Sequence, residues 1–223
     1  YERMIDRYLQ SPRYGEEQAR HWLDVARYAD THGLHLDNER EMWAWRDWVI
    51  EAFNRNVPFD QFTVEQLAGD LLPNPTQDQR VATAFNRLHR MTFEGGSIAE
   101  EFRQDGINDR VMTAGYGFMG LTMECSRCHD HKYDPLTMRD YYSLLDGFNR
   151  VPESGTPQYF SSRIRVAAPF LELPNESWLQ RQAELQAVVN AAEEQVRAAT
   201  APDFDMWQQQ VRTAGTLPRG EVL

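Results

Sequence analysis

The sequence predicts a mainly α-helical fold, in which an irregular multi-helix domain is followed by a helical extension at the C-terminal end. Three observations predict it. Apolar residues recur at helical spacing through most of the first 150 residues. Residues typical of helix starts, such as Thr76 and Thr137, precede some of these segments. Few segments alternate apolar and polar residues in the way that a half-buried strand does.

The sequence pattern predicts a series of helices in the first half of the chain. Pro58 with Asp60, and later Thr76, are typical of the first residues of a helix. The stretch 31–41 is polar and irregular, which predicts a loop between two helices. Helices are expected here over residues 1–10, 14–28, 42–55, 59–69 and 77–88.

Two more helices are expected before residue 150. Residues 98–119 form a long helical pattern, in which glycines at 106, 115 and 117 are candidate interruptions. Pro135 and Thr137 open a shorter helix that continues to about Phe148. The segment between these two helices contains both cysteines of the chain.

The character of the chain changes near residue 150, which predicts a domain over residues 1–150. Residues 151–175 are rich in proline and small polar residues and are expected to form a connector, with 163–167 as the best strand candidate. Residues 176–223 are expected to be a helical extension, with one helix over 176–199 and a second over 203–213, as in a helical hairpin. We interpret the chain as a fragment of a longer protein.

Charge and hydropathy exclude some classes of function. A formal net charge of -11 repels phosphate backbones, so nucleic acid is a poor candidate partner. The sequence has no uninterrupted apolar run long enough for a transmembrane helix. Six Trp, nine Tyr and eleven Phe in 223 residues supply enough apolar side chain for a core.

The pattern Cys125-Ser126-Arg127-Cys128-His129 is the motif that carries chemistry. In C-x-x-C-H, each thiol can add across one vinyl group of haem to give a thioether bond. The histidine after the second cysteine then serves as the proximal ligand of the iron. The motif therefore predicts covalently attached haem c, with Cys125 and Cys128 as attachment sites and His129 as the iron ligand.

Three alternatives remain open at this stage. Cys125, Cys128, His129 and His131 include four zinc ligand types, although structural zinc sites usually draw on a second, distant pair. A thioredoxin-like dithiol would need a strand–motif–helix setting, whereas this chain reads as helical. The third alternative is a pair of inert buried cysteines beside a surface histidine.

Several ordered blocks of the sequence, ending in the cysteine motif, resemble the DUF1549 family, which is common in planctomycete bacteria. The blocks lie at residues 21–30, 45–50, 58–62, 65–73, 86–90, 94–96, 100–103, 109–111 and 120–135. The resemblance covers about residues 1–150, and Gly106-Ile107-Asn108 departs from the form expected of the family. Members often carry a cytochrome-like domain upstream and a DUF1553 domain downstream. The resemblance therefore implies a periplasmic or otherwise extracytoplasmic, multidomain, haem-associated protein.

A sixth ligand of the iron would decide between electron carrier and catalyst. Candidates are the eight methionines and five histidines, His21, His32, His35, His89 and His131. We single out His89 as a candidate distal ligand, while His131 lies too close to His129 and is better placed to orient a neighbouring group. Arginines recur at positions 27, 87, 90, 103 and 110. Pairing with a carboxylate of the protein is favoured for each of them, yet at least one is expected to bind a haem propionate.

We therefore expect a c-type haem protein that serves as a redox or electron-transfer module of a larger extracytoplasmic protein. Its expected partners are other domains of the same polypeptide, and a redox partner protein or a small-molecule substrate. The first alternative is a haem enzyme, such as an oxidase, peroxidase or dehydrogenase, that acts on a small or carbohydrate-derived substrate. The second is a structural zinc-binding scaffold module.

Overall fold

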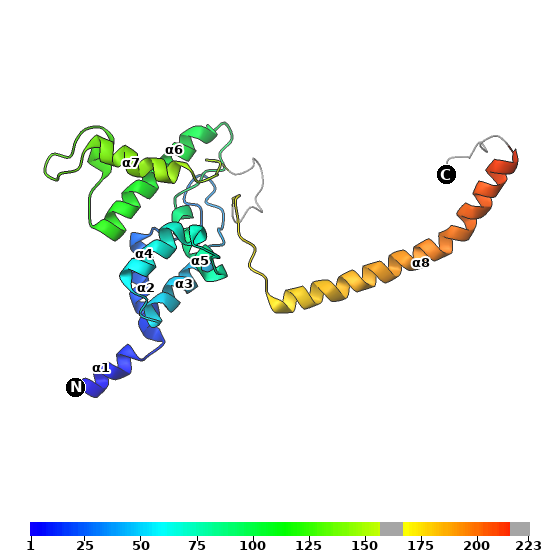
Figure 1. The fold of residues 1–223 in the computed structure, drawn as a ribbon, viewed down its shortest axis with the longest axis horizontal. Helices are drawn as coiled ribbons and strands as arrows, with labels where there is room; N and C mark the ends of the chain where they lie inside the picture. Colours follow the sequence, from blue (N-terminus) through cyan, green and yellow to red (C-terminus); the bar gives the residue numbers. More distant parts are fainter. Residues whose placement is uncertain (157–166, 215–223) are drawn as a thin grey trace. The chain divides into compact units, whose positions relative to one another are not determined.

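The computed structural model describes residues 1–156 and 167–214 of the chain (Figure 1). The described residues form helices and no β-strand. Two isolated β-bridges, Thr31 with Glu39 and Gly33 with Met91, are the β-type pairings among them. The predicted mainly α fold is thus confirmed. The chain divides into two compact units, Tyr1–Leu171 and Glu172–Leu223.

The first unit contains seven α-helices among its described residues, and short 3₁₀ or π turns lie between the later ones, from α4 to α7. The α-helices are α1 (Glu2–Leu9), α2 (Arg13–Val25), α3 (Trp43–Asn54), α4 (Phe59–Ala68), α5 (Gln77–Ala82), α6 (Ala99–Ala114) and α7 (Met138–Asn149). The short turns are η1 (Gly69–Leu71), η2 (Thr83–Arg87), η3 (Gly115–Met119) and η4 (Glu124–Arg127). The helix α2 packs against α3, and α6 packs against α7, which crosses it in Figure 1.

Two of these helices begin with a capping box. The Thr76 side chain accepts a hydrogen bond from the Gln79 amide while the Gln79 side chain accepts one from the Thr76 amide. Thr137 and Asp140 make the same reciprocal pair at the start of α7. Each box satisfies two backbone donors that the first turn leaves without intrahelical partners. The predicted helix starts at these threonines are confirmed.

A first hydrophobic core lies among α2, α3, α4 and η2. Trp45 and Trp48 are buried in it, and Trp22 packs edge-on against Phe62 with ring centroids 5.1 Å apart. Trp43, by contrast, is exposed. Three of the four clustered tryptophans therefore contribute to packing, as aromatic residues at helical spacing usually do.

A second core joins α6 to α7 and to the segment that carries the cysteines. Ile107, Val111 and Tyr141 are almost completely buried there, together with Met123 just before η4. The Tyr141 hydroxyl donates to the Asn108 side-chain oxygen at 2.7 Å. The cysteine motif thus follows directly on a residue that is fixed in a core.

The predicted helices over 77–88 and 98–119 both end earlier than their sequence patterns suggest. After Ala82 the chain tightens into the 3₁₀ turn η2, and after Ala114 it widens into the π turn η3. Gly120 follows in the left-handed conformation, with φ at 63°, and ends the helical stretch. Of the candidate interruptions, Gly115 does mark the end of α6, whereas Gly106 lies inside the continuous helix.

The first unit extends beyond the boundary expected near residue 150. Arg87 donates hydrogen bonds to the carbonyls of Ala167, Ala168 and Pro169 at 3.1 to 3.3 Å. The Glu153 side chain is only 1% exposed, so residues on both sides of 157–166 pack into this unit. The strand candidate 163–167 lies outside the described residues except for Ala167.

The second unit is dominated by one helix, α8 (Glu176–Ala214), of 39 residues. The expected hairpin of two helices is wrong, because the chain stays helical between 199 and 203. Its apolar residues, among them Trp178, Leu185 and Val188, are largely exposed. Across the described chain, no helix combines the length and the apolarity needed to cross a membrane.

Candidate functional site

The cysteine motif is wound into a single helical turn. The amide groups of Cys128 and His129 both donate to the Cys125 carbonyl, each at 3.3 Å. Residues three and four positions apart on such a turn share one face. The two cysteines and the histidine are therefore held side by side by the local backbone alone.

Both cysteines are free thiols and are exposed. Of the two residues between them, Ser126 is fully buried and anchors the turn, with its amide nitrogen 3.0 Å from the Met123 carbonyl oxygen. The Tyr142 hydroxyl of α7 donates to the Arg127 carbonyl at 3.0 Å. The turn is thus attached to the second core through Ser126 and α7, while both thiols remain exposed to solvent.

The hydrogen bond of His129 defines which of its ring nitrogens is free. Nδ1 lies 2.7 Å from the Asp130 carbonyl oxygen. A carbonyl oxygen only accepts, so Nδ1 must donate its proton. In the neutral ring the lone pair is then on Nε2, which is the arrangement of a metal-ligating histidine whose other nitrogen is oriented by an acceptor.

This donor set fits covalently attached haem. Two accessible thiols lie on the same turn as an imidazole whose Nε2 is available as an iron ligand. The residues that would hold the group are the three predicted from the motif, Cys125, Cys128 and His129.

The same geometry does not favour a zinc site. No group of three or more His, Cys, Asp or Glu side chains in residues 1–156 and 167–214 could hold a metal ion. His131 Nδ1 accepts hydrogen bonds from the amides of Tyr133 and Asp134, at 3.3 and 2.9 Å. The neutral His131 ring therefore carries its proton on Nε2 and has no lone pair left for a metal.

His89, the candidate distal ligand, is buried in a cluster of charged residues. Its Nδ1 lies 3.5 Å from Arg110 Nη2, and its Nε2 lies 3.8 Å from a carboxylate oxygen of Glu153. An arginine can only donate, so Nδ1 accepts and Nε2 carries the proton toward Glu153. In this arrangement His89 offers no free lone pair, and its surroundings do not favour a role as iron ligand.

The environment also keeps His89 uncharged. Burial lowers the pKa of His89 well below its ordinary value, and the nearby charges of Arg110 and Arg87 lower it further. An imidazolium would be both desolvated and repelled here, so a neutral ring is the stable form.

The other histidines are spread over the first unit. His21 on α2 and His35 in the 31–41 loop are exposed. His32 is buried and packs against Phe93, with ring centroids 4.8 Å apart. None of these observations singles out one of these three histidines as the sixth iron ligand.

Most of the recurring arginines pair with protein carboxylates. Arg27 contacts Asp109 at 2.5 Å, Arg103 contacts Glu100 at 2.8 Å, and Arg87 and Arg110 share Glu153. Burial lowers the pKa of Arg27 and raises that of Asp109, although their attraction opposes both shifts. The fifth, Arg90, is exposed.

Sequence reasoning missed two residues that shape these sites. Asp130 supplies the acceptor for His129, and its position directly after the motif was a signal that could have found it. Glu153 neutralises two buried arginines from within the expected connector. Its partners lie 43 or more positions away in the sequence, so no local pattern identifies it.

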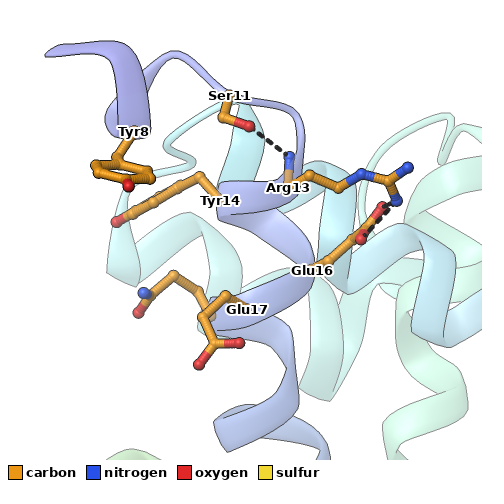
Figure 2. A pocket seen from close by; sticks show the side chains of 7 residues that line it. Tyr8, Ser11, Arg13, Tyr14, Glu16 and Glu17 are labelled. Atoms are coloured by element: carbon orange, nitrogen blue, oxygen red, sulfur yellow. Dashed lines mark hydrogen bonds and ion pairs between the residues drawn. The ribbon is translucent and has the colours of Figure 1, made fainter. Parts of the chain in front are cut away.

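Two hollows lie elsewhere on the first unit. One, of about 430 Å³, opens between α1 and the start of α2, where Tyr8 and Tyr14 line it and Arg13 pairs with Glu16 (Figure 2). The other, of about 530 Å³, is lined mainly by apolar residues, among them Trp22, Phe53 and Phe59. Neither is lined by a residue of the cysteine motif.

Comparison with known proteins identifies the family but not an activity. No curated protein and no solved structure matches the chain. The family model PSCyt2, described as a protein of unknown function (DUF1549), matches residues 1–153. This match ends at Glu153, the residue that completes the buried arginine cluster. The chain therefore belongs to the DUF1549 family.

Proposed function

We propose that Cys125 and Cys128 attach haem covalently, that His129 is the proximal iron ligand, and that the chain is an electron-transfer module of a larger extracytoplasmic protein. The observation that carries the proposal is the single turn that holds two accessible thiols beside a histidine with a free Nε2. Haem bound there would supply an iron that gains and releases one electron.

The position of the turn favours a carrier over an enzyme. The motif residues other than Ser126 are exposed, and neither hollow of the first unit includes them. An exposed cofactor suits electron exchange with a partner, whereas catalysis on a substrate usually takes place in a shaped, partly closed pocket. We propose that the partners are other domains of the same polypeptide, among them a cytochrome-type domain, or a separate redox protein.

The proposed location follows from the chemistry of attachment. Free thiols that await haem are handled on the oxidising side of a membrane, where c-type haem is attached. We therefore propose a periplasmic or equivalent extracytoplasmic location, as in a planctomycete envelope.

Absorption spectroscopy tests haem attachment. The chain is exported to the periplasm of a host with the c-type haem attachment machinery, purified and extracted with acidified acetone. We expect the Soret and α bands to remain with the protein. Cys125→Ala and Cys128→Ala should each shift the α band of the pyridine complex to longer wavelength, because one vinyl group stays conjugated, and the double variant should lose the haem on extraction.

Two further variants separate ligation from attachment. His129→Ala should alter the iron spectrum, whereas Glu101→Ala, at an exposed position on α6, should not. Loss of all haem from the unsubstituted protein on extraction would overturn the proposal. An unchanged spectrum in His129→Ala would overturn the assignment of the proximal ligand.

A further inference from the structure

The peptide bond between Asp130 and His131 is hydrogen-bonded on both sides. Its carbonyl oxygen accepts from His129 Nδ1 at 2.7 Å, and its N–H donates to the Leu136 carbonyl at 2.8 Å. A peptide group is planar, so fixing the direction of its N–H also fixes the direction of its carbonyl. Hydrogen bonds in such a chain polarise one another, which makes the carbonyl a stronger acceptor.

The side chains of the same two residues hold this peptide in place. Asp130 Oδ1 accepts from the Met138 amide at 2.8 Å, where a carboxylate is favoured by the start of α7. His131 is only 10% exposed at its side chain, and its Nδ1 accepts from the amides of Tyr133 and Asp134. These bonds fold residues 131–136 into a closed loop whose far end presents the Leu136 carbonyl to the peptide.

From this arrangement we infer that Asp130 and His131 are positioning residues for His129. Through the peptide that joins them, they hold the His129 ring in the tautomer with Nε2 free and increase its electron donation. The inference rests on the proposed function, because a ring oriented in this way is useful if Nε2 binds iron. Neither side chain touches the iron ligand itself; both act through the backbone carbonyl.

The tautomer can be read without haem. In the ¹⁵N-labelled haem-free 223-residue chain at about pH 8.5, where ordinary histidines are neutral, long-range ¹H–¹⁵N spectra report which ring nitrogen carries the proton. We expect His129 to be protonated on Nδ1 and His131 on Nε2. Asp130→Ala and His131→Ala should move His129 toward the Nε2-protonated form that exposed histidines adopt, with His21 as the internal reference.

Matched variants distinguish positioning from loss of structure. Asp130→Asn and His131→Asn each keep an oxygen near the acceptor they replace, so both should retain the Nδ1-protonated His129. If His129 is protonated on Nε2 in the unsubstituted chain, or if the alanine variants leave its tautomer unchanged, the inference is overturned.

A second measurement uses the haem-loaded chain. Weaker donation from His129 destabilises the ferric form, so His131→Ala should raise the reduction potential, and His131→Asn should restore it toward that of the unsubstituted protein. These two variants carry the same charge, which removes a Coulombic explanation. Equal potentials in all three proteins would overturn the inference, whereas failure of haem to attach at all would overturn only the proposed function and leave the tautomer test standing.

Discussion

At the scale of single residues, His89 links the stability of the first unit to pH. Its pKa is lowered in the folded protein by burial and by Arg110 and Arg87, while the unfolded chain keeps a pKa of about 6.5. Below about pH 6.5 the unfolded chain therefore binds a proton that the folded protein does not. Above that pH both states are neutral, and His89 contributes no pH dependence.

We predict that replacing His89 with Gln flattens the acid side of the stability profile. The unsubstituted protein should lose up to about 1.4 kcal/mol of unfolding free energy per pH unit below about pH 6.5 through this residue, and the variant should not. Urea titrations between pH 5 and pH 8 followed by circular dichroism measure the slope. His21→Gln, at an exposed position, should keep it, and an equal slope in His89→Gln would refute the assignment.

Gly106 shows why a residue inside a helix can escape sequence-based prediction. The sequence marks it as a candidate interruption, yet α6 continues through it, and the His89 ring occupies the space beside it. A Cβ at this position would come within 2.9 Å of His89 Cδ2. The reason for the glycine is thus a side chain 17 positions away, which no helical periodicity reveals.

We predict that Gly106→Ala destabilises the protein, although alanine is the better helix former by about 1 kcal/mol. The contact with a buried ring should cost about 1 to 3 kcal/mol, as overpacking usually does, which leaves a net destabilisation of up to about 2 kcal/mol. Gly147→Ala on α7, where an added Cβ meets nothing within 4 Å, is the control and should be neutral or stabilising. Urea denaturation midpoints decide, and a stabilised Gly106→Ala would contradict the packing argument.

At the scale of elements, most helix bounds were predictable to within one residue, whereas the early ends of α5 and α6 were not. The capping boxes at Thr76 and Thr137 use side chains within three residues of each other, so the sequence carries the whole signal. The change from α5 to η2 accompanies contacts across the fold, such as the Asn86 side-chain amide that donates to the Gln66 carbonyl. Such partners are set by tertiary packing, which overrides local propensity.

The cap of α7 has a second consequence, because the Met138 amide in the first turn of the same helix donates a hydrogen bond to the Asp130 side chain. We predict that Thr137→Ala lowers the free energy of unfolding by about 1 kcal/mol and also loosens the His129 hydrogen bond. Thr76→Ala removes an equivalent cap elsewhere and should cost a similar amount without changing the His129 ring signals. The two variants are compared by urea denaturation and by the ring ¹⁵N spectrum. An identical His129 spectrum in both would show that the cap of α7 does not affect the His129 hydrogen bond.

At the scale of the whole molecule, the candidate site and the domain boundary were predictable to different degrees. The proposed haem site is local, since residues 125–131 supply the thiols, the histidine and the acceptor carbonyl, so the motif identifies its main members. The boundary depends on Glu153, which pairs with Arg87 and Arg110 across a long stretch of sequence. The composition change near residue 150 marks where the helices end, whereas the first unit continues to Leu171.

The position of Glu153 beyond residue 150 predicts the stability of chains that are truncated at residue 150 or at residue 171. A chain of residues 1–150 lacks Glu153 and would leave Arg87 and Arg110 buried without a carboxylate, whereas a chain of residues 1–171 keeps the ion pairs and the carbonyls that Arg87 binds. Removing one partner of a buried pair costs about 3 to 5 kcal/mol. We therefore expect 1–171 to unfold cooperatively in urea, and 1–150 to be less stable by at least that amount or unfolded.

The substitution Glu153→Gln in the 1–171 chain isolates the carboxylate from the rest of the deleted segment. Gln has nearly the same shape but no charge, so this variant should lose most of the stability that 1–150 loses, because the uncompensated arginine charges are the same in both. If Glu153→Gln is as stable as the unsubstituted 1–171 chain while 1–150 is not, the boundary is maintained by the backbone contacts of residues 167–169 and not by the ion pairs. If all three chains are equally stable, residues 151–171 do not contribute to the stability of the first unit, and its boundary lies near residue 150.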